Sequence, residues 1–411
     1  MNKTKVTSLA VVFTTAAILC SCTVADQSSD HSDSTIKVTS GQMTEILTSS
    51  ESTSQPQDSS TQASKTTATK HDVSFSQVGD FRKINIPEYI SNLGELTAVS
   101  DKVICGVTGI IDNDGKCSHD QLGFIDISSG GFFLIPLPEG IEIRNIRKGS
   151  GDILCNVEWY YRDYADDEYN TITGFHMCMV KIKKDYSFET YEDCSMSDIA
   201  FDFNGHKICQ WAESIYDLSS GVEKRIVEGV PTESNVSKMG KYCSFLFGID
   251  ENRFAYKISG YESMPGLGVY DFSSGISTFL PDTENKNPIG TYNGKIFSVS
   301  SVLQTGCGSK IYVTDTDTMT TSLLTDICES DGGTDVIISM SEDGRRIAAI
   351  INRHNTDGTC TPELCILDSS DGHIIISYDI SDLNKNWWDI KFIDNTTIII
   401  EGNDSYIMDI E

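Results

Sequence analysis

The sequence predicts an all-β protein assembled from repeated four-stranded antiparallel sheets. A short phrase recurs along the chain, as IDISSG at 125–130, YDLSSG at 216–221, YDFSSG at 270–275 and LDSSDG at 367–372. In each copy a strand ends in Asp, and a turn that contains Gly supplies the positive φ required by a tight hairpin. Asn/Asp/Gly turns precede these hairpins, as in TYNGKIFSVS at 291–300. No stretch of a dozen residues shows helical periodicity.

The spacing of the repeats indicates how many sheets there are. The strand-ending residues are Asp126, Asp217, Asp271, Asp315 and Asp368, and the last three steps are about 40 to 55 residues long, the length of one propeller blade. The wider first gap leaves room for another blade, with a strand near 174–185. The sequence therefore predicts a β-propeller of seven four-stranded blades.

Closure of this ring is also predicted. The end of the chain, DIKFIDNTTIIIEGNDSYIMDIE, supplies three strands, whereas FRKINIP at 81–87 is an unassigned strand near the start of the folded region. A closed ring leaves no open sheet edge between its first and last blades. We therefore expect the N-terminal strand to complete the last blade.

The N-terminal residues have the features of an export signal. Lys3 and Lys5 precede an apolar run from Val6 to Leu19 that is short for a membrane-spanning helix. Leu19-Cys20-Ser21-Cys22 resembles the lipobox of bacterial lipoproteins. The resemblance implies that 1–21 is a signal peptide and that Cys22 carries a lipid (palmitate-type) anchor, which places the protein outside the cytoplasm on the cell membrane, as at a Gram-positive surface. Plain secretion is the alternative.

Residues 22–74 are rich in Ser and Thr and poor in aromatic residues, so we expect a disordered tether. About 50 flexible residues have a root-mean-square reach of about 40 Å. The propeller domain is expected to occupy 75–411.

The net charge of -29 and the pI near 4.5 argue against a nucleic-acid partner, which would require clustered Lys and Arg. Cations fit this charge better, although the surplus can also simply keep an exported protein soluble. Eleven cysteines follow Cys22, an odd number. A disulfide between Cys360 and Cys365 is one open possibility.

The repeats resemble the WD40-like and the TolB-like or quinoprotein-like β-propellers. SMSEDGRRIAAI at 339–350 is similar to the SPDGRRIA turn of TolB-type repeats, but the WD and GH dipeptides of true WD40 blades are absent at their usual places. The resemblance implies the fold and leaves the activity open, because propellers have many functions.

The candidate binding surface comes from loop lengths. The connections between the second and third strands of the blades are predicted to be long, at 109–121, 158–174, 259–266, 302–309 and 353–363. All should emerge on one face, and long loops on a rigid scaffold commonly carry function.

The loop at 158–174 is the richest of these in aromatic and acidic residues. It contains the predicted ligand-binding residues Trp159, Tyr160, Tyr161, Tyr164, Asp166 and Asp167. Aromatic faces can stack on sugars or cations, and carboxylates can accept hydroxyl hydrogen bonds. The alternative is that the aromatic residues form the loop's own small core.

Catalytic motifs are missing: there is no GxSxG, HExxH or P-loop. No catalytic residue, metal or cofactor is therefore predicted, and Asp112 and Asp114 are interpreted as a hairpin turn rather than a calcium loop. The favoured hypothesis is a non-enzymatic binding or scaffolding module for a glycan, peptide or protein. The alternative is a hydrolase or lyase with its site over the central channel, using acids together with His119 or His354.

Overall fold

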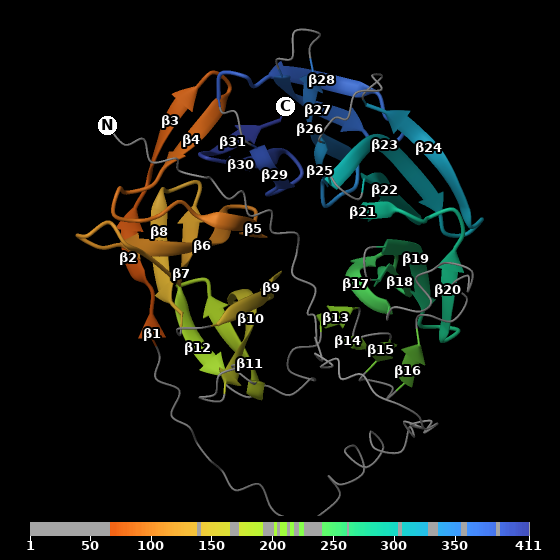
Figure 1. Cartoon of the computed structure of the whole chain (residues 1–411), viewed down its shortest axis with the longest axis horizontal. Coiled ribbons are helices and arrows are strands. Elements are labelled where there is room, and N and C mark those ends of the chain that lie inside the picture. The colour runs from red at the N-terminus through yellow and green to blue at the C-terminus, as the bar shows by residue number, and fades with distance from the viewer. Residues whose placement is uncertain are drawn as a thin grey trace, which may run out of the picture. The chain divides into compact units, whose positions relative to one another are not determined.

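A computed structural model describes residues 66–137, 141–164, 172–191, 201–203, 206–211, 214–217, 222–225, 241–260, 263–302, 306–327, 336–354, 360–383 and 387–410. Their regular structure consists of strands, and no helix occurs among them. All strand pairs among these residues are antiparallel. Within each four-stranded repeat, consecutive strands are joined by hairpins. In Figure 1 the sheets surround a common centre, and the strands nearest to it are β5, β9, β13, β17, β21, β25 and β29.

The first half of the chain forms three sheets. The first contains β5 to β8, the second β9 to β12 and the third β13 to β16. Their bounds are β5 (Gly94–Ser100), β6 (Val103–Ile111), β7 (Cys117–Asp126), β8 (Gly131–Pro136), β9 (Glu142–Lys148), β10 (Ile153–Tyr164), β11 (Ile172–Lys183), β12 (Ser187–Tyr191), β13 (Phe201–Phe203), β14 (His206–Trp211), β15 (Ser214–Asp217) and β16 (Val222–Arg225).

The second half repeats this arrangement. Its strands are β17 (Lys241–Gly248), β18 (Arg253–Gly260), β19 (Ser263–Asp271), β20 (Ile276–Leu280), β21 (Lys286–Tyr292), β22 (Lys295–Val302), β23 (Gly306–Asp315), β24 (Thr320–Asp326), β25 (Val336–Met340), β26 (Arg346–His354), β27 (Cys360–Asp368), β28 (Ile374–Asp379), β29 (Trp387–Phe392), β30 (Thr397–Gly402) and β31 (Ser405–Asp409). The chain is a β-propeller.

The number of blades differs from the expected seven. The described strands form six hydrogen-bonded sheets, one of which has eight strands. That sheet combines β21–β24 with β25–β28, because Cys307 in β23 forms a bridge pair with Val336 in β25. Two four-stranded repeats are thereby joined into one blade. The spacing of the repeats in the sequence does not reveal this contact, because it depends on how two strand ends meet in the fold.

Closure of the ring follows the prediction. β4 (Phe81–Asn85) pairs with β31, the last strand of the chain, with Tyr406 opposite Lys83 and Ile407 opposite Arg82. A second contact lies at the same junction, where the buried carboxylate of Glu401 accepts hydrogen bonds from the backbone amides of Glu95 (2.9 Å) and Leu96 (3.0 Å). The N-terminal strand therefore completes the last blade, and hydrogen bonds to the buried Glu401 side chain join that blade to β5 of the first.

The structured region begins earlier than the expected boundary at 75. Three short strands, β1 (Thr66–Thr67), β2 (Thr69–Asp72) and β3 (Ser74–Val78), run along the outer edges of three successive blades. β1 pairs with β12, β2 with β8 and β3 with β4. We call residues 66–78 the outer belt; it gives these three sheets a fifth strand.

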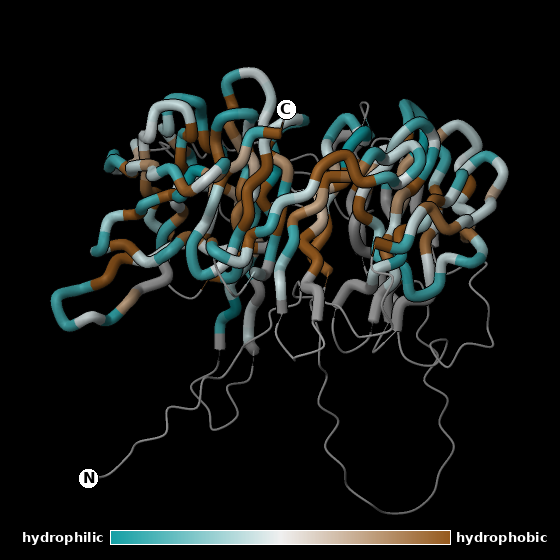
Figure 2. Tube along the Cα trace, turned by 90° about the horizontal axis from the view of Figure 1, so that it is seen from above, coloured by the Kyte–Doolittle hydropathy of each residue, from teal (hydrophilic) through white to brown (hydrophobic). Residues whose placement is uncertain are grey.

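The hydrophobic core lies between neighbouring sheets. In β26, Ile347, Ala349 and Ile351 pack in one cluster, whereas Ala348 and Ile350 pack in the cluster on the opposite face. Both faces of the sheet are buried, which explains why this strand is apolar at successive positions instead of alternating. Figure 2 shows the hydrophobic segments along the strands and hydrophilic segments at the turns.

The repeated phrase specifies a hairpin turn. Its Asp is the last residue of the third strand, at the ends of β7, β15, β19, β23 and β27 as predicted. In the third copy, the Asp271 side chain accepts hydrogen bonds from the amides of Ser273 (2.7 Å) and Ser274 (3.2 Å), and Gly275 has φ 66°. The same Gly position has φ 72° at Gly130 and 75° at Gly372.

Candidate functional site

The tight turns of neighbouring sheets contact one another and define one face of the ring, which we call the turn face. Arg253, at the start of β18, donates a hydrogen bond to Asp317 in the turn between β23 and β24 (2.7 Å). The amide of Asp343 likewise donates to the side chain of Asn395 in the next sheet (2.9 Å). The connections between second and third strands lie at the opposite ends of the sheets, which we call the hairpin face.

The expected long loops on the hairpin face are mostly strand. β6 and β7 pair up to Ile111 and Cys117, and β26 and β27 pair up to His354 and Cys360. Strand pairing thus continues through most of each expected loop, because antiparallel ribbons satisfy their own backbone groups. The possible disulfide between Cys360 and Cys365 is excluded, because the two residues lie five positions apart along one extended strand.

The small turn between β6 and β7 is a hairpin, as predicted. The Asp112 carboxylate accepts hydrogen bonds from the amides of Asp114 (3.0 Å) and Lys116 (2.8 Å). Gly115 has φ 75°, which suits a turn position. This carboxylate thus serves the backbone of its own turn.

The candidate ligand-binding segment is the end of the β10–β11 hairpin. These two strands have twelve residues each and pair from Ile153 opposite Lys183 to Tyr164 opposite Ile172. Cys155, Val157 and Trp159 alternate along β10 and pack in the core between this sheet and the first sheet. Trp159 is only 2% exposed, so this residue belongs to the core between the two sheets, neither a ligand-binding residue at the surface nor part of a separate small core within a loop.

One face of the hairpin carries a buried tyrosine between two charges. Tyr160 donates a hydrogen bond to Glu142 of the neighbouring β9, and Arg162 donates to the same carboxylate (2.7 Å). The Arg162 guanidinium also lies 4.9 Å from the centre of the Tyr160 ring. Burial, followed by the bond to Glu142, raises the pKa of Tyr160, which keeps its hydroxyl protonated.

The other face carries a stacked aromatic pair. The rings of Tyr161 and His176 are parallel within 10° with centroids 4.5 Å apart, and His176 Nε2 lies 2.8 Å from Asp163 Oδ2. Gly174 lies opposite Asp163, and a Cβ at Gly174 would come within 2.8 Å of the carboxylate. The absence of a side chain at Gly174 therefore makes room for the contact between Asp163 and His176.

The structure places only part of the predicted site. Trp159 and Tyr160 are buried, and Tyr161 is half-buried. The Tyr164 side chain, Asp166 and Asp167 lie outside the described residues, as do the side chains of His119 and His354. Glu142, Arg162 and His176 were not among the predicted site residues. Pairing 158–164 with 172–176 as two strands of one hairpin would have placed His176 opposite Tyr161.

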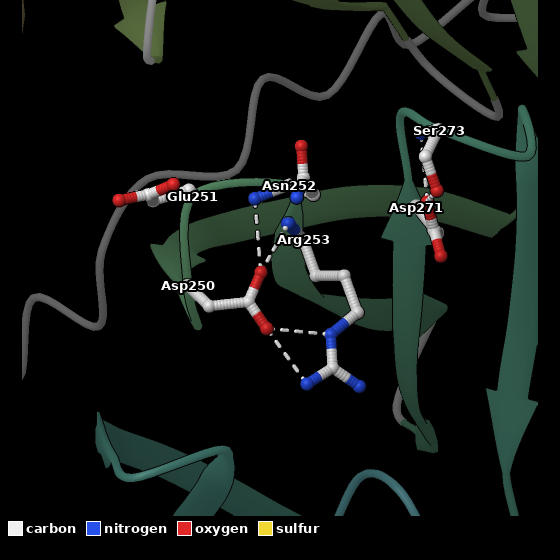
Figure 3. Close-up of a pocket in the computed structure, with 6 residues that line it drawn as sticks. All are labelled: Asp250, Glu251, Asn252, Arg253, Asp271 and Ser273. Carbon is white, nitrogen blue, oxygen red and sulfur yellow. Dashed lines mark hydrogen bonds and ion pairs between the residues drawn. The ribbon is translucent and has the colours of Figure 1, made fainter.

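A pocket on the turn face is lined mainly by polar and charged residues, two of which are paired with each other. It has a volume of 340 Å³ and is lined by Asp250, Glu251, Asn252, Arg253, Asp271 and Ser273. Figure 3 shows Asp250 and Arg253 pointing toward each other. Arg253 contacts Asp250 through two nitrogens at 2.7 Å. Burial alone would raise the pKa of Asp250, but hydrogen bonds from the amide of Asn252 and from Arg253 lower it.

A second pocket lies at the central channel. It has a volume of 250 Å³ and is lined by the innermost strands of four repeats, through Thr97, Ala98, Lys148, Ser339, Met340, Glu342, Lys391, Phe392, Ile393 and Asp394. Lys148 Nζ lies 2.7 Å from Glu342 Oε2, and Lys391 Nζ lies 2.5 Å from Asp389 Oδ2. The pocket therefore brings Lys148 of β9 beside Glu342, which follows β25, whereas Lys391 and Asp389 belong to the same strand, β29.

No group of three or more metal-ligating side chains occurs in the part of the chain that the structure describes, and no helix there could span a membrane. Trp387 packs between the last two blades against Tyr406, whereas the side chain of Trp388 is outside the described set.

No protein-family model matches the chain, and a search of curated proteins found no match. Among solved structures, the chain is similar to oligogalacturonate lyase from Vibrio parahaemolyticus, with 11% identity over 84% of this chain and 99% of that one and a TM-score of 0.45. The chain is also similar to the propeller domain of the Trilobed protease from Pyrococcus furiosus, which has an open velcro topology, with 11% identity over 76% of this chain and 92% of that one and a TM-score of 0.42. The WD40 domain of SCAP from fission yeast is similar with 11% identity over 81% of this chain and 98% of that one and a TM-score of 0.37.

Proposed function

We propose that this protein is a lipid-anchored β-propeller at the cell surface that binds a glycan, peptide or protein through its hairpin face, without catalysing a reaction. The observation that carries the proposal is the β10–β11 hairpin. One face of its end carries the Tyr161–His176 stack with the Asp163 carboxylate beside it, and the other face carries the Glu142–Arg162 pair. Stacked rings beside fixed hydrogen-bonding groups suit a sugar or a peptide backbone.

The pairing of charges supports binding over catalysis. Arg162 and His176 each lie 2.7 to 2.8 Å from a carboxylate oxygen, of Glu142 and Asp163 respectively. Groups that are already paired and half-exposed form a fixed recognition surface, whereas general acid–base catalysis needs a group poised to exchange a proton with substrate.

The experiment is a glycan and peptide array probed with the full chain that carries Cys22→Ala. Removing one stacking ring typically costs about 1 kcal/mol, so Tyr161→Ala is expected to weaken binding about fivefold. Tyr89→Ala is the matched control, because Tyr89 is 47% exposed and lies before β5, outside the sheet that contains β10 and β11. Equal affinity of Tyr161→Ala and the parent for every bound ligand would contradict the proposal.

The anchor is tested separately. Cys22→Ala is expected to release the protein from the membrane fraction into the medium, because the thioether-linked lipid can no longer form. Retention of this variant in the membrane fraction would refute lipidation at Cys22 and leave the binding proposal untouched.

A hydrolase or lyase with its site over the channel is the second candidate. It is supported by the channel pocket, in which Lys148 and Glu342 form an ion pair with exposed side chains. A substrate that displaced Lys148 from this exposed pair would free the Glu342 carboxylate to act as a general base. Turnover of a polysaccharide or peptide substrate that is lost in Glu342→Gln would establish this function in place of simple binding.

A further inference from the structure

Exposed large apolar side chains gather on one part of the outer rim. Six of the nine in the described residues lie on β20, β28 or β24 and its turn, namely Ile276, Met319, Leu323, Ile374, Ile375 and Ile376. These strands are the outermost strands of consecutive repeats, as Figure 1 shows. Exposed apolar residues are ordinary when scattered, but a group on adjacent elements indicates an interaction surface.

The rim differs from the opposite side in its edge strands. There the outer belt covers the edges of β8, β12 and β4. β28 pairs only with β27 among the described strands, and β20 and β24 likewise pair with one neighbour each. An unpaired edge presents backbone donors and acceptors that another strand can bind.

β28 is the most apolar of these edges. Its sequence is IIISYD, without Lys, Arg or Pro, the residues that usually protect an edge from further pairing. Ile375 is the extra residue of a bulge, since Ile376 pairs with Ile366 and Ile374 with the next residue, Leu367. The bulge explains why successive isoleucines are exposed, and it leaves Ile376–Asp379 in regular register for pairing.

The charge around this edge specifies the partner's chemistry. The adjoining turns carry Asp317 (73% exposed), which is paired with Arg253, and Asp371 (62% exposed), which lies 2.6 Å from His373, and β24 and β28 each end in Asp. No Lys or Arg occurs in β20, β24 or β28. Basic side chains on an added strand would therefore meet acidic groups, while its apolar side chains would cover the isoleucines.

We propose that the open edge of β28 binds an extended segment of a partner protein in which apolar and basic residues alternate. The segment adds to the sheet as a fifth strand, with main-chain hydrogen bonds supplying affinity and alternate side chains supplying specificity. The chain completes three of its own edges in this way; β2, TKHD, for example pairs along β8 from Thr69 opposite Leu134 to Asp72 opposite Gly131. This surface is separate from the β10–β11 hairpin.

The test uses the full chain and a dye-labelled probe peptide of alternating lysine and valine. We expect saturable binding by fluorescence anisotropy, together with slower hydrogen exchange of the β28 amides when the probe is bound. A peptide of the same composition with two central prolines is the control for strand pairing, because proline cannot donate to the ladder.

Paired substitutions test the site. Ile375→Lys and Ile375→Glu both remove the apolar side chain, but only the first introduces repulsion toward a basic strand. A cross-strand charge pair contributes up to about 1 kcal/mol, and the two variants differ by one attraction and one repulsion, so Ile375→Lys should bind about fivefold more weakly than Ile375→Glu. Ile276→Lys on β20 is the matched control and should bind within about twofold of the parent.

Three results would overturn the proposal: no probe binding, equal affinity of the Lys and Glu variants, or protection of amides outside β28. Light scattering that shows a dimer disrupted by Ile375→Lys would assign the edge to a second copy instead. Protection of β28 amides in the full chain that is lost on removing residues 23–65 would assign it to the chain's own N-terminal segment.

Discussion

Two copies of the repeated turn provide a sharp test of how local conformation and packing combine. Gly275 and Gly372 occupy the same turn position, with φ 66° and 75°, and each amide donates to the carbonyl of its strand-ending Asp at 2.8 Å. Their surroundings differ. A Cβ at Gly275 would meet nothing within 4 Å, whereas one at Gly372 would lie 2.7 Å from Thr325 Cβ.

The expected free-energy costs follow from this difference. An alanine in the left-handed region costs about 1 kcal/mol, which is the whole cost expected for Gly275→Ala. Gly372→Ala adds an overpacking cost of about 1–3 kcal/mol against Thr325, to give a total of about 2–4 kcal/mol. The two variants change the same atom in the same turn, so their difference measures packing alone.

Equilibrium urea unfolding, followed by tryptophan fluorescence, measures both variants against the parent. We expect the midpoint to fall slightly for Gly275→Ala and two to four times as far for Gly372→Ala, with unchanged slopes. Equal midpoints for the two variants would refute the packing argument. A parental midpoint for Gly275→Ala would refute the requirement for a left-handed residue.

Three further predictions concern stability. Glu401→Ala should lower the free energy of unfolding by about 2–4 kcal/mol, because two backbone amides at the ring closure lose their carboxylate acceptor, whereas Glu342→Ala, at a side chain 72% exposed, should change it little; equal urea midpoints would contradict this. Hydrogen bonds, above all from the Ser273 side chain, lower the pKa of Asp271, so the ionised carboxylate stabilises the fold fully above about pH 4 and this contribution is lost as the pH falls. Between pH 6 and pH 3 the urea midpoint of Asp271→Asn should therefore fall less than that of the parent, and identical pH profiles would refute this role of Asp271. Met319 has φ 55° where the other turns have Gly, so Met319→Gly should raise thermal stability by up to about 1 kcal/mol, and a lower melting temperature would refute the strain.

Local turn chemistry made the fold predictable. The strand-ending Asp residues and the closing strand at 81–87 were identified because tight turns require particular residues, which the sequence shows directly. The outer belt was missed, because TKHD has no periodicity of its own and becomes a strand only through pairing with β8. Tertiary pairing of this kind leaves no local signal.

The candidate site was less predictable for a similar reason. Residues 158–164 were interpreted as loop because aromatic and charged residues interrupt the apolar pattern, yet they continue β10 in register with β11. That pairing buries Trp159 in the core and brings His176 beside Tyr161. Register between strands decides which side chains face a ligand, and a single sequence specifies it weakly.

The outer belt determines how a pull on the N-terminus is borne. Tension on the chain upstream of Thr66 reaches first the two residue pairs between β1 and β12, then β2 on β8, and then β3 on β4. These three short strand pairs can separate one after another, and the force needed to break each pair resists the pull. β4 is also held by β31, so the closed ring can stay intact while the belt peels away.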